Sequence, residues 1–262
     1  MAIPRSRLAA FEPLVDFIFP PRCPLCGEAL AKQDGLCVGC WGRLHRPGEP
    51  ACRLCQRPLA AQTEGAADGF VCAPCLVARP RHHGIHAATL YTDSSRALVL
   101  GLKRGRRLGH ARLMARMMAG ALPPLEGEWL LVPVPLHRWR LWARGFNQSV
   151  ELARMLARGL GQPLAVDALV RVRRTPSLGG LSRAARARAL AGAIRASPRR
   201  AAALDGAKVL LVDDVLTSGA TSDACVAALR RAGAVEVRIA CFARVLDEAL
   251  DHDRGFDAAA LP

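Results

Sequence analysis

An apolar run, an acidic pair and a hydroxyl-rich loop follow one another over residues 209–221. Val209–Val212 precedes Asp213 and Asp214, and Gly219 lies in the loop that opens the next segment of helical pattern. Adjacent carboxylates can accept hydrogen bonds from the vicinal hydroxyls of a ribose. The free N–H groups at the start of a helix attract a phosphate, and glycine lets the backbone approach it closely. Together these features predict a pocket for ribose 5-phosphate. Its residues are Asp213, Asp214, Val215, Leu216, Thr217, Ser218, Gly219, Ala220 and Thr221.

A second strand-like segment, Leu131–Pro135, leads into a strongly cationic stretch over residues 137–148. The prolines interrupt the hydrogen-bond ladder, so the chain is expected to leave the sheet there. Arginine side chains and backbone N–H groups in such a loop can surround a pyrophosphate. We expect Arg144 to face that ligand, Phe146 to pack and Asn147 to cap the helix that follows.

The same stretch has a second interpretation, in which aromatic residues stack on the bases of single-stranded nucleic acid over a basic surface. The residues concerned are Trp139, Trp142 and Phe146, and a third interpretation places them in the core. Residues 101–107 are predicted to form a basic loop punctuated by glycines. Lys103 in this loop could close over the pyrophosphate as part of a lid, and a solvated charged turn is the alternative.

Eight of the ten cysteines lie between residues 23 and 75, in four C-x-x-C pairs. Each pair can present two thiolates to one ion, and two pairs complete the closed four-cysteine shell of structural zinc. A short polar region has little core of its own, so bound zinc would supply its folding energy. Disulfides, scattered free thiols and iron–sulfur ligation are weaker alternatives. The expected zinc ligands are Cys23, Cys26, Cys37, Cys40, Cys52, Cys55, Cys72 and Cys75.

Sequential pairing along the chain is the simplest arrangement of these ligands, and an interleaved arrangement stays open. A filled four-thiolate shell leaves no open position, so the ions are not expected to be catalytic. Cys225 and Cys241 lie in apolar surroundings and are expected to be buried. Four nearby histidines are not needed for a shell and are expected at the surface, namely His45, His82, His83 and His86.

The chain has 262 residues and a formal net charge of +15, carried almost entirely by arginine. Such a charge fits a phosphate-rich partner, either a small molecule or nucleic acid. No window of about 18 uncharged apolar residues exists, so no membrane span is expected. The N-terminal apolar stretch contains Glu12 and Asp16 and lacks a small-residue cleavage site. A signal peptide is therefore not expected, and the predicted location is cytoplasmic.

Composition divides the chain into three regions. Residues 1–22 form a lead-in that is expected to be an amphipathic helix, and residues 23–80 hold the cysteine pairs. Residues 81–262 alternate strand-like and helical patterns, which predicts an α/β domain with a mostly parallel sheet flanked by helices. Strands are expected near residues 87–91, 129–135, 208–213 and 235–243. Helices are expected over residues 108–122, 147–160 and 220–232, with Gly233 at the end of the last, and residues 184–203 are expected to be helix plus loop.

The string from Asp213 to Thr221 is more specific than an acidic pair that merely caps a helix. It resembles the motif of type I phosphoribosyltransferases that binds phosphoribosyl pyrophosphate (PRPP), with Ser218 in place of a usual threonine. Combined with the C-x-x-C pairs, Leu102-Lys103, Val132–His137 and Arg144–Gln148, it resembles the ComF family of bacterial proteins over nearly the whole chain. The resemblance implies a double zinc ribbon over residues 23–80 and a type I phosphoribosyltransferase-like domain over residues 81–262.

The resemblance also implies a function, which is phosphoribosyl transfer with release of pyrophosphate, linked to DNA uptake in natural competence. Asp213 and Asp214 would orient the ribose, residues 217–221 would anchor the 5-phosphate, and Mg²⁺ with Lys103 and Arg144 would bind the pyrophosphate. The acceptor and any separate catalytic base are not assigned. The alternative is a non-catalytic protein that binds PRPP or single-stranded DNA and docks other DNA-uptake proteins.

One further stretch departs from the family pattern. Leu178 stands where glutamine is usual, and Ala189 stands where asparagine is usual. Two polar groups are therefore missing, which puts acceptor recognition by this segment in question. The positions that match the pattern are Arg171, Arg173, Thr175, Leu181 and Arg186.

Overall fold

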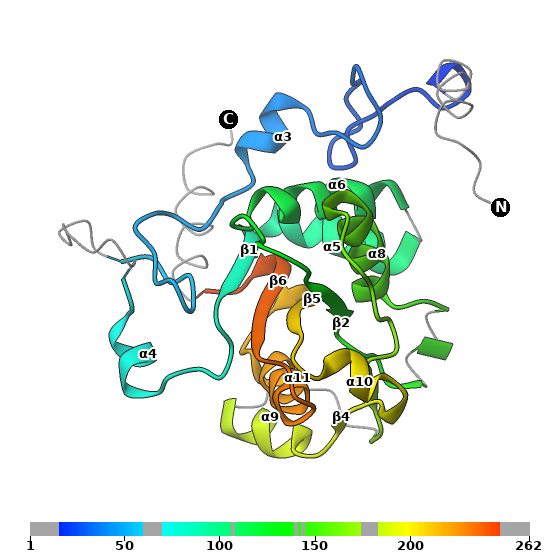
Figure 1. The fold of residues 1–262 in the computed structure, drawn as a ribbon. Coiled ribbons are helices and arrows are strands. Elements are labelled where there is room, and N and C mark those ends of the chain that lie inside the picture. Colours follow the sequence, from blue (N-terminus) through cyan, green and yellow to red (C-terminus); the bar gives the residue numbers. More distant parts are fainter. Residues whose placement is uncertain are drawn as a thin grey trace.

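The computed structural model describes residues 16–59, 70–105, 108–138, 141–142, 145–173 and 183–246. At its centre is a four-stranded sheet in the order β1-β6-β5-β2, and each neighbouring pair of strands is parallel (Figure 1). The predicted α/β class with a parallel sheet is confirmed. The strands are β1 (Ile85–Leu90), β2 (Leu130–Pro133), β5 (Lys208–Leu216) and β6 (Glu236–Arg244).

Strand β5 is central, and its first half is apolar on both faces. Val209–Val212 is fully buried, as expected of a parallel strand covered on both sides. The strand continues beyond its predicted end at Asp213 and pairs with β6 as far as Leu216. Strand β2 stops earlier, where Pro133 pairs with Val212. The acidic pair therefore lies within β5, at the point where β2 no longer flanks it.

Helices cover both faces of the sheet (Figure 1). Leu210 and Val212 point into the core on one face, and Val209 and Leu211 into the core on the other, following the alternation of strand side chains. Within the described residues, none of the helices has both the length and the apolar composition that crossing a membrane requires. The face of the sheet that bears Leu210 and Val212 carries α5 (Asp93–Gly105), α6 (Leu108–Gly120) and α8 (Gln148–Leu160). The other face carries α11 (Ala220–Arg231), with α9 (Arg183–Leu190) and the hairpin of β3 (Leu169–Arg171) and β4 (Ile194–Ala196) beside it.

Local sequence signals set the helix ends near the site. The Asn147 side chain accepts a hydrogen bond from the Ser149 N–H at 3.0 Å and so caps α8, as predicted. Gly233 follows α11 with φ of 96°, a conformation that favours glycine. A Cβ at Gly233 would also approach the Cα of Asp205 to 2.9 Å. Glycine is therefore required there by both conformation and space.

The predictions for residues 101–107 and 184–203 are wrong in part. Helix α5 continues through Gly105, so Lys103 lies in a helix and not in a basic loop. Leu98, Val99 and Leu102 explain the helix, because their helical spacing buries all three against the core. Residues 184–203 contain more than helix and loop. They also hold β4, the 3-10 helix η1 (Pro198–Arg200) and α10 (Ala201–Leu204).

The two cysteine-rich modules repeat one backbone design. The first C-x-x-C pair of each module forms a turn, closed by hydrogen bonds from the Gly27 N–H to Cys23 O and from the Gln56 N–H to Cys52 O. Gly27 and Gln56 both have positive φ, 80° and 58°. The second pair of each module begins a short helix, α3 (Val38–Gly42) in the first and α4 (Ala73–Val77) in the second. Modules this small depend on the thiols for their shape, because their described core clusters consist mainly of the cysteines.

Both modules pack against the sheet domain. The edge strand β1 donates backbone hydrogen bonds to them, from Ile85 to Leu54 O and from Leu90 to His45 O, which covers an edge that would otherwise be open. The first module also contacts α6 through an ion pair between Asp34 and Arg112 at 2.8 Å. The domain boundaries expected at residues 22 and 80 stay a prediction.

Candidate functional site

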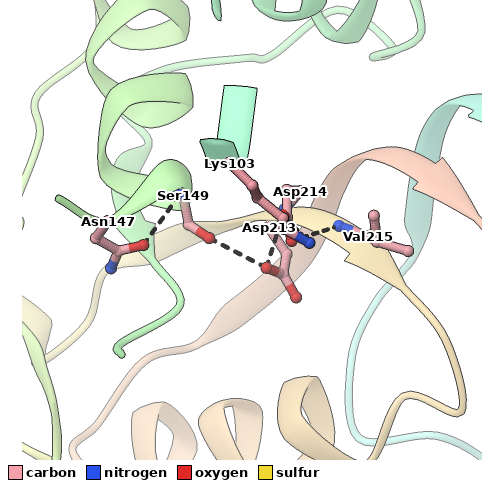
Figure 2. Close-up of polar contacts among 6 residues, drawn as sticks. All are labelled: Lys103, Asn147, Ser149, Asp213, Asp214 and Val215. Carbon is pink, nitrogen blue, oxygen red and sulfur yellow. Dashed lines mark hydrogen bonds and ion pairs between the residues drawn. The ribbon is translucent and has the colours of Figure 1, made fainter. Parts of the chain in front are cut away.

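The carboxylate of Asp213 is held from two sides (Figure 2). Its Oδ1 accepts hydrogen bonds from the Ser149 hydroxyl at 3.1 Å and from the Asp214 N–H at 2.9 Å. Asn147 fixes the first turn of α8 and thereby places Ser149 against Asp213. Asp214 Oδ1 accepts from the Val215 N–H at 2.8 Å. A carboxylate has about four lone-pair sites, so both side chains retain acceptor capacity for ligand hydroxyls.

Lys103 of α5 forms an ion pair with Asp214, with 2.7 Å between Nζ and Oδ2 (Figure 2). Lys103 therefore offsets the charge of one member of the acidic pair. Within the described residues Asp213 forms no ion pair of its own, and the charge of Lys103 lowers its pKa only in part. Burial, followed by the charge of Asp214, raises the pKa of Asp213 to about 8, against the opposing hydrogen bonds from the Asp214 N–H and Ser149. A carboxyl group perturbed by burial and a like charge is characteristic of functional sites.

The phosphate loop, Thr217–Gly219, joins β5 to α11. Gly219 is the N-cap of α11 and has φ of 77°, which favours glycine. The Asp223 N–H donates to Gly219 O at 2.7 Å, so the N–H groups ahead of Asp223 have no acceptor within the helix. Those N–H groups, the helix dipole and the hydroxyls of Thr217, Ser218 and Thr221 can bind a phosphate.

The cationic stretch after β2 is described in part. Arg144 and Trp139 lie outside the described residues, so their expected roles stay predictions, as does binding of pyrophosphate by Lys103. Phe146 is half-buried and packs against the core, as predicted. Trp142 is 82% exposed, so the interpretation that places it in the core is wrong.

The cysteines form two clusters, and the pairing is the sequential one. The sulfur atoms within each cluster all lie within 4.8 Å of one another. The Sγ–Sγ distance is 3.5 Å both for Cys26 and Cys37 and for Cys55 and Cys72. Four thiolates around one zinc, at the usual bond length, are spaced by about 3.8 Å, so both clusters fit structural zinc. The clusters are Cys23, Cys26, Cys37, Cys40 and Cys52, Cys55, Cys72, Cys75.

In each cluster, hydrogen-bond donors favour the thiolate form of one cysteine, whereas burial raises the pKa of Cys40, Cys72 and Cys75. Against burial, which raises it, backbone hydrogen bonds lower the pKa of Cys23 to about 6 and that of Cys52 to about 7. In the first cluster the Arg43 guanidinium donates to Cys40 Sγ at 2.9 Å. The protein therefore supplies hydrogen bonds to the shell as well as the four ligands.

Comparison with known proteins agrees with this combination of zinc clusters and phosphate loop. The family model of a double zinc ribbon domain matches residues 14–76, and that of a phosphoribosyl transferase domain matches residues 147–258. The chain is 33% identical over 234 residues to the DNA utilization protein YhgH of Salmonella typhimurium strain LT2, covering 87% of this chain and 98% of the relative. The chain belongs to the ComF family.

Two further similarities accompany ComF membership. Competence protein F of Haemophilus influenzae is 28% identical over 230 residues, covering 85% of this chain and 96% of the relative. A solved structure of an allosteric regulatory enzyme of purine biosynthesis is 25% identical, with a TM-score of 0.35 over 50% of this chain and 25% of that chain.

Sequence reasoning missed two residues near the site of this ComF protein. Ser149 donates a hydrogen bond to Asp213. The sequence feature that could have identified Ser149 is its position two residues after Asn147, the predicted helix cap. Arg244 is the last residue of strand β6 and is 9% exposed. The sequence feature that could have identified it is a charged residue directly after an apolar run.

His82 was expected at the surface but is 7% exposed, so that prediction is wrong.

The remaining sequence predictions have mixed outcomes. Cys225 and Cys241 are fully buried, as expected, and burial raises the pKa of Cys241 to about 12. In the stretch that departs from the ComF pattern, Arg173 donates to the backbone oxygens of Ala189 and Ala191. Thr175, Leu178, Leu181 and the side chain of Arg186 lie outside the described residues.

Proposed function

We propose that this ComF family member binds PRPP together with Mg²⁺ and transfers the 5-phosphoribosyl group to a nitrogen acceptor. The observation that carries the proposal is the position of Asp213 and Asp214 on β5, directly ahead of a phosphate loop that caps α11. One strand–loop–helix unit thereby offers carboxylates to a ribose diol and N–H groups to a 5-phosphate. These are the two ends of a bound ribose 5-phosphate.

In the proposed reaction, a nitrogen of the acceptor forms a bond to C1 of the ribose as the C1–O bond to pyrophosphate breaks. Pyrophosphate leaves with that electron pair, and the proton lost by the nitrogen passes to water. Asp213 and Asp214 hold the ribose hydroxyls, and residues 217–221 hold the 5-phosphate. Lys103 and Arg144 are the proposed cations for the leaving group, and bound Mg²⁺ would neutralise its oxygens. Positioning and electrostatics supply most of the rate enhancement.

Calorimetric titration with PRPP and Mg²⁺ tests the binding step. The wild type and the exposed-site control Asp93→Ala are expected to show saturable binding, and the double variant Asp213→Ala/Asp214→Ala none. Absence of binding by folded, zinc-loaded wild type would refute the proposal. Pyrophosphate release tests the transfer step, and release that survives loss of both aspartates would exclude these residues from it.

A second candidate function is non-catalytic binding of PRPP or single-stranded DNA. The net charge of +15 and the exposed Trp142 favour it, because basic grooves with aromatic platforms bind single strands. Affinity for an oligonucleotide should then fall steeply with salt, and binding that is absent or insensitive to salt would exclude this role. The names of the relatives support a place in DNA handling beside other DNA-uptake proteins, which we propose to be in the cytoplasm.

A further inference from the structure

A cavity of about 850 Å³ lies between the phosphate loop and the second zinc ribbon. Thr217–Gly219 and the first turn of α11 form one wall. The opposite wall consists of Cys55, Cys72 and the segment Arg79–His82. Asp213 and Asp214 are not among the described residues that line it. The cavity therefore adjoins the proposed ribose 5-phosphate site and shares its loop.

The strongest indication of a ligand in this cavity is Arg244. It lines the cavity, is 9% exposed, and its buried Nε and Nη1 have no hydrogen-bond partner in the described part of the chain. A guanidinium is always charged, and burying one without a partner is strongly unfavourable. The neighbouring His82 does not relieve it. Burial, followed by the charge of Arg244, lowers the pKa of His82 to about 4, which leaves this side chain neutral.

The charges around Arg244 are mostly positive as well. Arg57, Arg79 and Arg81 also line the cavity, whereas Asp223 is the carboxylate among the described lining residues. The thiolate shell of the second zinc is itself net negative and offsets part of this excess. A volume of this size is typical of small-molecule sites. A small anion that meets Arg244 would thus supply the missing hydrogen-bond acceptors.

We infer that this cavity takes the acceptor of the phosphoribosyl group, and that the acceptor is a small molecule with a carboxylate or phosphate that Arg244 binds. This inference rests on the proposed function and adds the substrate class. It assigns the second zinc ribbon a role beyond stability, because the ribbon forms a wall of the acceptor site. The nucleophilic nitrogen of the acceptor points toward the ribose, and its acidic group points toward Arg244.

Matched pairs of acids and neutral analogues test the inference. Orotate with uracil and nicotinate with nicotinamide are titrated calorimetrically at fixed ionic strength. Ribose 5-phosphate is present, so the phosphate loop is filled and no transfer can occur. At least one acid is expected to bind about 10-fold or more tightly than its neutral partner, as a hydrogen bond to a charged group implies. Arg244→Gln should remove that preference, Arg244→Lys should keep part of it, and the exposed control Arg158→Gln should keep all of it.

Three results would overturn the inference: equal binding of acid and neutral analogue, equal losses in Arg244→Gln and Arg158→Gln, or binding of neither member of any pair. Binding that depends on Arg244 for an oligonucleotide but for none of the acids would also overturn it. A PRPP titration of the same proteins separates this failure from failure of the proposed function. If PRPP binds the wild type and Arg244→Gln alike, the PRPP site stands and the acceptor assignment alone is wrong.

Discussion

Replacing Asp213 with asparagine should stabilise the ligand-free protein while it abolishes binding of PRPP. The reason is that Asp213 sits against Asp214 in a partly buried position, where burial and the charge of Asp214 outweigh the favourable charge of Lys103. Asparagine keeps the shape of the side chain and can still accept hydrogen bonds from Ser149 and the Asp214 N–H. It removes the charge that the folded state disfavours, together with an acceptor that the ribose hydroxyls need.

The size of the effect depends on pH, and its sign follows from the pKa. The folded-state pKa of about 8 lies above the ordinary value of 3.8. Between these values the folded protein retains a proton that the unfolded chain has lost, so stability falls as the pH rises through this window. The full slope is about 1.4 kcal/mol per pH unit. From pH 6 to pH 7 the wild type should therefore lose up to about 1.4 kcal/mol that Asp213→Asn does not lose.

Urea unfolding at several pH values between 6 and 8, with zinc present, measures this difference. The fluorescence of Trp129, which is 1% exposed in the sheet domain, follows the transition. The free energies of the wild type and Asp213→Asn should diverge as the pH rises. The exposed control Asp93→Asn should run parallel to the wild type. Parallel lines for all three proteins would refute the argument that the folded state holds Asp213 protonated at neutral pH.

Three further predictions concern the rest of the structure. Cys26→Ser should lose one of the two zinc ions and Cys225→Ser neither, as counted by metal analysis; two ions in both would contradict the assignment of Cys26 as a ligand. Gly219→Ala should lower the free energy of unfolding by about 1–2 kcal/mol, because its φ of 77° is unfavourable for alanine; a Cβ there would clash with no atom. Gly233→Ala should lower it further, because a Cβ there would also clash with the Asp205 backbone. Similar urea midpoints for the two variants would contradict this. Lys103→Met should destabilise the ligand-free protein by about 1–2 kcal/mol by leaving the Asp214 carboxylate without its cation, and an unchanged midpoint would show that the ion pair contributes nothing.

Local patterns predicted the elements that carry the proposed phosphate site. The apolar run of β5, the Asn147 cap and the glycine of the phosphate loop each act through near neighbours in the chain, and each is placed as expected. The cysteine pairs were predictable for a similar reason, because their spacing is set by the metal shell and not by distant packing. Sequential pairing of the C-x-x-C units was the simplest arrangement, and it is the observed one because few residues separate the two units of each cluster.

The positions of three residues depend on contacts between distant parts of the chain, and local sequence patterns could not predict them. Lys103 was expected in a loop because glycines and arginines surround it, yet the burial of Leu98 and Leu102 holds the segment helical. The contact of Ser149 with Asp213 joins residues 64 positions apart. Arg244 likewise lines one cavity with the second zinc ribbon, which is far from it in the chain, and no local pattern records that proximity.

Asp213 and Arg244, which lie next to the phosphate loop, show why this fold retains buried ionisable side chains that lower its stability. Asp213 is a carboxyl group whose ionised form is disfavoured, and Arg244 is a buried cation whose Nε and Nη1 have no described hydrogen-bond partner. Packing alone would select neutral side chains at both positions, and natural proteins break such rules mainly where a ligand compensates them. Both groups lie next to the same loop. A sugar phosphate with hydroxyls for the first, and an anionic acceptor for the second, would relieve both within a single complex.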